Sequence, residues 1–271
     1  MRSIAVKSPD GMTIAAYEGG NPAGPAILFI HGLMQCHLAW RRQFDDPALA
    51  GAFRLIAIDL RGHGASDKPL GKEHYRADKL WADDIAAVIE QTDLRRPVLV
   101  GWSFAGRVIT DYLRVHGQAD IAGFDFVGAS TKSDSALLGP AIKLVAGALA
   151  DDLAACIEGT RAFLRACFER QPTPEEFEFM LAYNMVVPAQ VRAAVVDRVA
   201  NPGDMLARLT CPVLVSHGSK DPFMLPAMAQ FTASQVKGAR LSLYDGIGHS
   251  PFYEDAPRFN RELAEFTRAA Q

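Results

Sequence analysis

The segment VLVGWSFAGRV, residues 98–108, places a serine between two contrasting patterns. The residues before Ser103 are apolar without alternation, which is typical of a strand buried on both faces. The residues after it mix polar and apolar types as in a surface helix. Gly101, Ala105 and Gly106 are small, so the two backbones can approach closely around the serine. Such a strand, turn and helix predict either an exposed nucleophile or a helix N-cap at this serine.

Other apolar runs of the same kind recur along the chain. They are rich in Val, Ile, Leu and Phe, are bounded by Gly, Pro or Asp, and lie at 26–32, 54–60, 124–130, 212–218 and 239–246. Helical periodicity separates several of them, and an alternating pattern precedes them all. The sequence therefore predicts an α/β fold that begins with a hairpin and has a mostly parallel central sheet with helices on both faces.

This alternation of strand and helix is interrupted between residues 131 and 208. The interval has no strand pattern, and its apolar residues recur at helical spacings. Because strands and helices alternate again on both sides of this interval, we expect a helical insertion between two core strands. The predicted core comprises residues 1–130 and 209–271, and the predicted insertion comprises residues 131–208.

Composition and charge restrict the class of protein. Of the 271 residues, 49% are hydrophobic and 22% are charged, which is enough apolar material for a full core. A formal net charge of -3, without a long basic run, gives no indication of a nucleic-acid or membrane partner. No apolar run approaches the roughly 20 residues of a transmembrane helix, and no signal peptide is evident. We expect a cytoplasmic protein that acts on a small molecule; the oligomeric state stays open.

A nucleophilic serine needs a base and a group that orients the base, because a serine hydroxyl reacts poorly at neutral pH. Asp221 follows the apolar run at 212–218, and His249 follows the run at 239–246. Asp221 before a proline is also typical of a helix N-cap, and His249 is also typical of a turn. With Ser103 they occur in the order serine, acid, histidine after three predicted strands. This order predicts a catalytic triad.

Five segments outside the insertion carry a resemblance to a known family. They are FIHGL (29–33), IDLRGHGASDKP (58–69), VGWSFAGRV (100–108), VLVSHGSKDPF (213–223) and GIGHSPFYEDAPRFNREL (246–263). Through these five segments the chain resembles the α/β-hydrolase fold family, especially its cofactor-independent esterases, perhydrolases and haloperoxidase-like members. The pattern differs at Ala105, where the family commonly has a second glycine. The resemblance implies that Ser103 is the nucleophile, His249 the general base and acid, and Asp221 the group that holds the imidazole tautomer.

The resemblance also implies how the site is completed. The oxyanion hole would be formed by the backbone amides of Leu33 and Phe104, and the helical insertion would be a cap over the nucleophile. Apolar residues beside the motifs predict the substrate pocket; they are Met34, Trp102, Phe223 and Met224. The insertion adds further apolar residues, although such stripes are more typical of internal packing than of a pocket.

A serine at this position predicts acyl transfer, since family members that form an ester with the substrate use aspartate there. The sequence thus predicts a hydrolase that cleaves small to medium, hydrophobic carboxylic esters through an acyl-enzyme. Met34 stands where perhydrolases often have proline, which favours hydrolysis over perhydrolase or haloperoxidase activity. Hydrolysis of a carbon–carbon bond or a lactone is an alternative that an arginine in the pocket would support; the sequence does not place Arg107 or Arg161. A non-catalytic ligand receptor is the alternative of another class.

The other histidines carry no catalytic or metal-binding pattern. We expect His31 and His63 to organise loops, and His37, His74 and His116 to lie at the surface. The chain has no HExxH motif and no cysteine ligand set, so no metal is predicted. No GxGxxG motif follows a strand, so no dinucleotide cofactor is predicted.

Overall fold

A computed structural model describes residues 1–198 and 205–271 of the chain. Residues 199–204 fall within the predicted insertion and lie outside the described residues. Within the described ranges, eight strands form one sheet in the order β1-β2-β4-β3-β5-β6-β7-β8. The strands are β1 (Arg2–Lys7), β2 (Thr13–Gly20), β3 (Ala26–Ile30), β4 (Arg54–Ile58), β5 (Val98–Trp102), β6 (Gly123–Val127), β7 (Val213–Gly218) and β8 (Arg240–Tyr244).

The mostly parallel sheet confirms the predicted fold class. Strands β4, β3, β5, β6, β7 and β8 run parallel, and the predicted hairpin of β1 and β2 is antiparallel. Every residue of β3, β5, β6 and β7 is buried, as their continuous apolar runs indicate. Several strands end earlier than their apolar runs, because the last residues of those runs form the loops at the carboxyl edge of the sheet.

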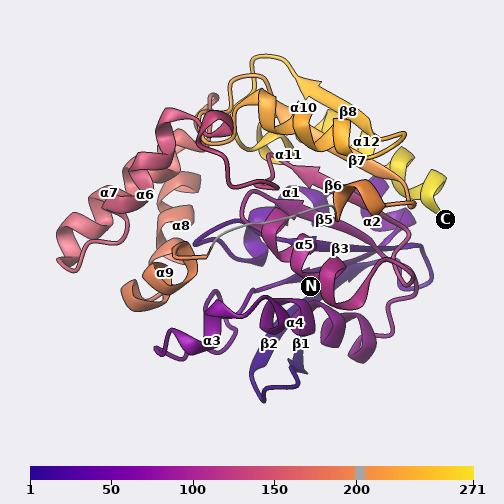
Figure 1. Ribbon diagram of the computed structural model, residues 1–271, viewed down its shortest axis with the longest axis horizontal. Coiled ribbons are helices and arrows are strands. Elements are labelled where there is room, and N and C mark those ends of the chain that lie inside the picture. The colour runs from indigo at the N-terminus through magenta and orange to yellow at the C-terminus, as the bar shows by residue number, and fades with distance from the viewer. Residues whose placement is uncertain (199–204) are drawn as a thin grey trace.

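Helices cover both faces of the sheet (Figure 1). Adjacent residues of β5 point to opposite sides: Leu99 packs in the core beneath α4, α5 and α10, and Val100 packs in the core beneath α12. The helices are α1 (Arg41–Phe44), α2 (Pro47–Ala52), α3 (Glu73–Arg76), α4 (Asp78–Gln91), α5 (Ala105–His116), α6 (Leu144–Gly147), α7 (Leu153–Ala166), α8 (Pro174–Met185), α9 (Ala189–Val196), α10 (Pro226–Gln235), α11 (Pro251–Glu254) and α12 (Ala256–Ala270).

Helices α6 to α9 connect β6 to β7 and group together at the left of Figure 1. The fully buried guanidinium of Arg192 joins them. It donates to the main-chain carbonyls of Ala148, Asn184 and Val187, which follow or end neighbouring helices, and to Thr160 Oγ1. Helix C-termini carry partial negative charge, so these carbonyls suit a buried cation. No single helix in the described ranges is long and apolar enough to cross a bilayer, but α8 and α9 together are, with an 84° bend between them.

Helix α5 lies unusually close to the segment that follows β6. A Cβ atom at Gly106 would lie 2.8 Å from Ser130 O and 2.9 Å from Ala129 Cβ, closer than real Cβ atoms pack. The methyl group of Ala105, in contrast, packs fully buried in the core under α5. The backbone crowding therefore requires glycine at position 106, and the departure from the family pattern at Ala105 leaves the turn intact.

We predict that Gly106→Ala lowers the free energy of unfolding by about 1–3 kcal/mol, because the added methyl group overpacks against Ser130. Gly51→Ala is the matched control, since a Cβ at Gly51 in α2 meets no atom within 4 Å. The control should leave the free energy unchanged or raise it by up to about 1 kcal/mol through helix propensity. Urea unfolding measures both, and equal effects at the two positions would contradict the crowding at Gly106.

Candidate active site

Ser103 lies in the turn between β5 and α5 with a left-handed backbone, at φ 56°. A non-glycine residue there is strained, and the strain persists only when the surroundings enforce it. Three main-chain hydrogen bonds do so: the Ser103 N–H donates to Val127 O at 2.9 Å, and its carbonyl accepts from Ser130 N at 2.9 Å and Gly106 N at 3.0 Å. The N-cap interpretation of Ser103 is wrong, because Phe104 occupies the cap position without a side-chain cap bond.

Asp221 and His249 meet at the carboxyl edge of the sheet, and both are buried. Asp221 Oδ2 lies 2.6 Å from His249 Nδ1. Asp221 Oδ1 accepts from the backbone amides of Phe223 at 2.8 Å and Met224 at 3.0 Å. Oδ1 of Asp221 thus makes the hydrogen bonds of a helix-capping residue, although α10 begins later, at Pro226. Oδ2 favours the imidazole tautomer of His249 with the proton on Nδ1, which leaves Nε2 as the basic nitrogen.

The pair of Asp221 and His249 depends on two residues for which the sequence predicts no positioning role. Gly128 leaves room for the pair, and Trp102 holds it. A Cβ at Gly128 would lie 3.1 Å from His249 Nδ1 and 3.3 Å from Asp221 Oδ2, and the φ of Gly128 is 50°. Trp102 donates from Nε1 to the His249 carbonyl oxygen at 2.9 Å. A glycine after a buried strand is the sequence feature that could have indicated this close approach.

His217 is a further buried residue beside Asp221 that sequence analysis missed. Its Nε2 lies 2.8 Å from Met224 O and 3.5 Å from Asp221 Oδ2. Burial lowers the pKa of His217. The neutral imidazole donates from Nε2 to the Met224 carbonyl and so holds the turn that carries Asp221. The sequence feature that could have indicated this role is the place of His217 at the end of β7, four residues before Asp221.

Leu33 and Phe104 lie near Ser103: Phe104 directly follows it, and a Cβ at Gly32, the residue before Leu33, would lie 3.3 Å from Ser103 Cβ. Within residues 1–198 and 205–271 neither amide has a hydrogen-bond partner, and both residues line the same cavity as Ser103. Unpaired amides at this point can donate to an oxygen that gains negative charge. The geometry is therefore suited to an anion next to the serine.

His31 and His63 hold the loop that carries Leu33. His31 donates from Nδ1 to Gly32 O at 2.7 Å, and its Nε2 accepts from Leu60 N at 3.0 Å. His63 donates from Nδ1 to Arg61 O at 2.9 Å, and its Nε2 accepts from Met34 N at 3.2 Å. Burial lowers the pKa of His31 to about 4 and that of His63 to about 3. Both rings are neutral at physiological pH, and both organise loops as predicted.

A cavity of about 380 Å³ lies between the core and helices α6 and α7. Ser103 and His249 both line it, as do the predicted pocket residues Phe223 and Met224. Its full lining is Leu33, Ser103, Phe104, Arg107, Ser130, Leu138, Ile142, Val145, Ala146, Leu149, Phe163, Val196, Phe223, Met224 and His249. Ser103, Arg107, Ser130 and His249 are polar, and the other lining residues are apolar.

The structure does not place Met34 and Trp102, two of the predicted pocket residues, in this cavity. Neither residue belongs to the lining of this cavity, and both pack in the core on the α12 face of the sheet. Trp102 directly precedes the turn, and its ring lies against Phe252 with centroids 4.8 Å apart. Met34 is fully buried, and its backbone is left-handed, with φ 61°. Proximity in sequence to the motifs did not place these side chains in the cavity.

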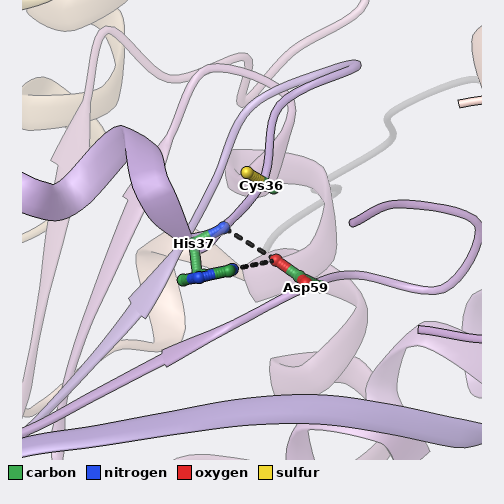
Figure 2. Close-up of side chains that lie close together, drawn as sticks. All are labelled: Cys36, His37 and Asp59. Atoms are coloured by element: carbon green, nitrogen blue, oxygen red, sulfur yellow. Dashed lines mark hydrogen bonds and ion pairs between the residues drawn. The ribbon is translucent and has the colours of Figure 1, made fainter. Parts of the chain in front are cut away.

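Cys36, His37 and Asp59 form a cluster with the composition of a metal site (Figure 2). Asp59 Oδ1 accepts from His37 N at 2.7 Å and His37 Nδ1 at 2.9 Å. Asp59 Oδ2 accepts from Ala65 N at 2.7 Å and the Tyr17 hydroxyl at 3.2 Å. Both oxygens are fully used by protein donors, so a cation would have to displace them. The surface position predicted for His37 is wrong: its side chain is 13% exposed and its ring stacks on Tyr17.

The comparisons with known proteins agree on one family. A model of the alpha/beta hydrolase family matches residues 27–262. A solved structure of a protein assigned as an aryl esterase from Burkholderia cenocepacia is 38% identical, with a TM-score of 0.95 over 99% of each chain. An esterase from Rhodococcus sp. ECU1013 is 32% identical, with a TM-score of 0.91 over 100% of each chain. An AB hydrolase superfamily protein of Bacillus subtilis is 27% identical over 97% of this chain and 98% of its own length.

The two loop histidines predict acid sensitivity. Each has a folded-state pKa below its unfolded value of about 6.5, so its contribution to stability is complete above that pH and is lost as the pH falls. By pH 5 the loss should reach up to about 2 kcal/mol per histidine, given folded pKa values of about 4 and about 3.

Urea unfolding at several pH values between 7 and 5 measures this loss. In His63→Gln, which keeps a donor and an acceptor but does not titrate, the dependence of stability on pH near pH 5 should be shallower by about 1.4 kcal/mol per pH unit. Equal slopes for the wild type and the variant would show that His63 is not held neutral.

Proposed function

Because the chain belongs to the alpha/beta hydrolase family, we propose that it hydrolyses small to medium carboxylic esters through an acyl-enzyme formed on Ser103. The observation that carries this proposal is that a strained serine and a histidine bonded to a buried carboxylate line one cavity. Esterases at 38% and 32% identity over nearly the whole chain support ester hydrolysis in particular.

The first half-reaction transfers the acyl group to the enzyme. His249 Nε2 removes the proton of Ser103 Oγ while Oγ forms a bond to the ester carbonyl carbon. The carbonyl oxygen becomes an oxyanion, which the amides of Leu33 and Phe104 stabilise by about 3 kcal/mol each. Asp221 holds the imidazole and stabilises the imidazolium. His249 then returns the proton to the alcohol oxygen as its bond to the carbonyl carbon breaks.

The second half-reaction restores the serine. Water enters as the alcohol leaves, and His249 removes one of its protons while the water oxygen attacks the acyl carbon. The same two amides hold the second oxyanion. When the bond to Ser103 Oγ breaks, His249 returns the proton to Oγ and the carboxylic acid leaves. The free enzyme is then ready for another ester.

The inserted helices act as a cap in this proposal. Val145 and Ala146 of α6 and Phe163 of α7 line the same cavity as Ser103 and His249. The core would thus comprise residues 1–130 and 209–271, and the cap residues 131–208. A cavity of about 380 Å³ with mostly apolar walls suits an acyl or alcohol group of modest size.

We expect a fluorophosphonate probe to label Ser103 and the wild type to hydrolyse 4-nitrophenyl butyrate. Ser103→Ala should lose the label and nearly all turnover, because alanine has no oxygen that can attack the ester carbonyl. Ser130 also lines the cavity, so Ser130→Ala is the matched control and should still be labelled. Labelling that persists in Ser103→Ala would overturn the nucleophile assignment. A protein that binds esters without turning them over would favour the receptor alternative.

We expect Asp221→Asn to lower kcat by about 10³- to 10⁴-fold, because an amide nitrogen facing His249 favours the wrong tautomer. Asp125→Asn is the matched control. Burial raises the pKa of Asp125 in β6 to about 8, so asparagine imitates its neutral form and activity should change little. Steady-state kinetics at pH 7, with circular dichroism to verify folding, measures both variants. A folded Asp221→Asn enzyme with wild-type kcat would exclude the proposed role of Asp221.

A further inference from the structure

Arg107 lies in the cavity that contains Ser103 and His249. It belongs to the first turn of α5, and it lines the cavity together with the polar residues Ser103, Ser130 and His249. Its Nη1 donates to the main-chain carbonyl of Arg198, and its Nε lies 3.4 Å from Ser130 Oγ. Within residues 1–198 and 205–271, its Nη2 has no hydrogen-bond partner. One edge of the guanidinium is therefore free to donate to another molecule.

The charge of Arg107 also lacks a bonded counter-charge in the described ranges. The nearby carboxylate of Asp111 is bonded to Arg198 and Arg114. Arg198 is bonded to Asp78 as well, at 3.2 Å. The local carboxylates are thus occupied by other guanidiniums, and the positive charge of Arg198 adds to that of Arg107.

Two other arginines differ from Arg107, either in their hydrogen bonds or in their position. Arg192 likewise has no carboxylate partner among the described residues, but its donors are taken up by main-chain carbonyls, Thr160 Oγ1 and Met185 Sδ. Arg161 lies outside the cavity lining and is bonded to Glu178. The structure thus decides what the sequence left open: of Arg107 and Arg161, the one in the cavity is Arg107.

Arg107 is partly buried, and an incompletely paired cation in such a place is costly, because it has lost hydration without gaining an opposite charge. Burial and the charge of Arg198 accordingly lower the pKa of Arg107. A carboxylate would restore what is missing, since a guanidinium binds two carboxylate oxygens with parallel N–H donors. The walls beyond Arg107, including Leu138, Ile142 and Leu149, are apolar and suit a hydrocarbon link to the scissile group.

We propose that Arg107 binds a carboxylate of the substrate, so that the preferred substrates are anionic esters with an apolar link between carboxylate and ester. Arg107 is then a specificity-determining residue for the reaction of Ser103. This inference rests on the proposed ester hydrolysis, and it adds the chemical class of the substrate. The carboxylate belongs either to the acyl group or to the alcohol, and matched substrates distinguish the two.

The experiment compares anionic esters with neutral isosteres. For the acyl side, the pair is mono-4-nitrophenyl glutarate and 4-nitrophenyl 5-methylhexanoate. For the alcohol side, the pair is 4-acetoxybenzoate and 4-isopropylphenyl acetate. In one of the pairs, the wild type should have a kcat/KM for the anion at least about 10-fold above that for the isostere. Arg107→Gln should reduce this ratio by about 10- to 100-fold, and Arg107→Lys should reduce it less.

Arg161→Gln is the matched control and should keep the wild-type ratio, because Arg161 lies outside the cavity lining. A wild type without preference for the anion in either pair would overturn the proposal. So would an Arg107→Gln enzyme that loses activity on both members of a pair equally, since a purely structural role predicts that result. If Arg107→Gln does not fold, Arg107→Lys replaces it as the test. An unchanged ratio of kcat/KM between anion and isostere in Arg107→Lys would then overturn the proposal.

A binding measurement separates this proposal from the proposed function. Calorimetric titration of glutarate into Ser103→Ala should give saturable binding that Ser103→Ala/Arg107→Gln loses. Binding without turnover of any ester by the wild type would contradict ester hydrolysis and still support the anion site. Turnover of neutral esters with no glutarate binding and no anion preference would support ester hydrolysis and overturn the anion site.

Discussion

The left-handed backbone of Ser103 is the constraint on which the candidate site depends. Its φ of 56° is maintained by main-chain hydrogen bonds to β6 and to the segment after it. Those bonds require α5 to approach that segment closely, and Gly106 permits the approach because a Cβ there would meet Ser130 O. The strain is therefore sustained by strand pairing and helix packing, and its consequence is a serine that reaches the cavity instead of capping the helix.

Buried histidines in this protein are distinguished by what their nitrogens bind. His31, His63 and His217 donate to main-chain carbonyls, and burial lowers the pKa of each. His249 and His37 instead face carboxylates, at 2.6 Å and 2.9 Å. A histidine–carboxylate pair is thus insufficient for chemistry by itself: His37 stacks on Tyr17, whereas His249 shares a cavity with a strained serine.

The cavity combines polar and apolar lining residues, and these come from different parts of the chain. Ser103, Arg107, Ser130 and His249 supply the polar groups from the core, and the helices between β6 and β7 supply much of the apolar wall. The two parts can therefore vary separately, because the geometry of Ser103, Asp221 and His249 depends on the sheet and the wall depends on the helices between β6 and β7. Arg107 joins the two parts, since it lies one turn after Ser103 and donates to Arg198 beyond α9.

The sequence alone determined the fold class, the strands and the three candidate residues Ser103, Asp221 and His249. Continuous apolar runs report burial on both faces, and turns after such runs must lie at one edge of a parallel sheet. Only the tertiary structure decided which side chains enter the cavity. Met34 and Trp102 adjoin the motifs yet face the α12 core, while Arg107 and Gly128 acquire their roles from neighbours distant in sequence. Local pattern encodes which residues are buried, but the direction of each side chain depends on strand twist, loop course and the elements packed against it.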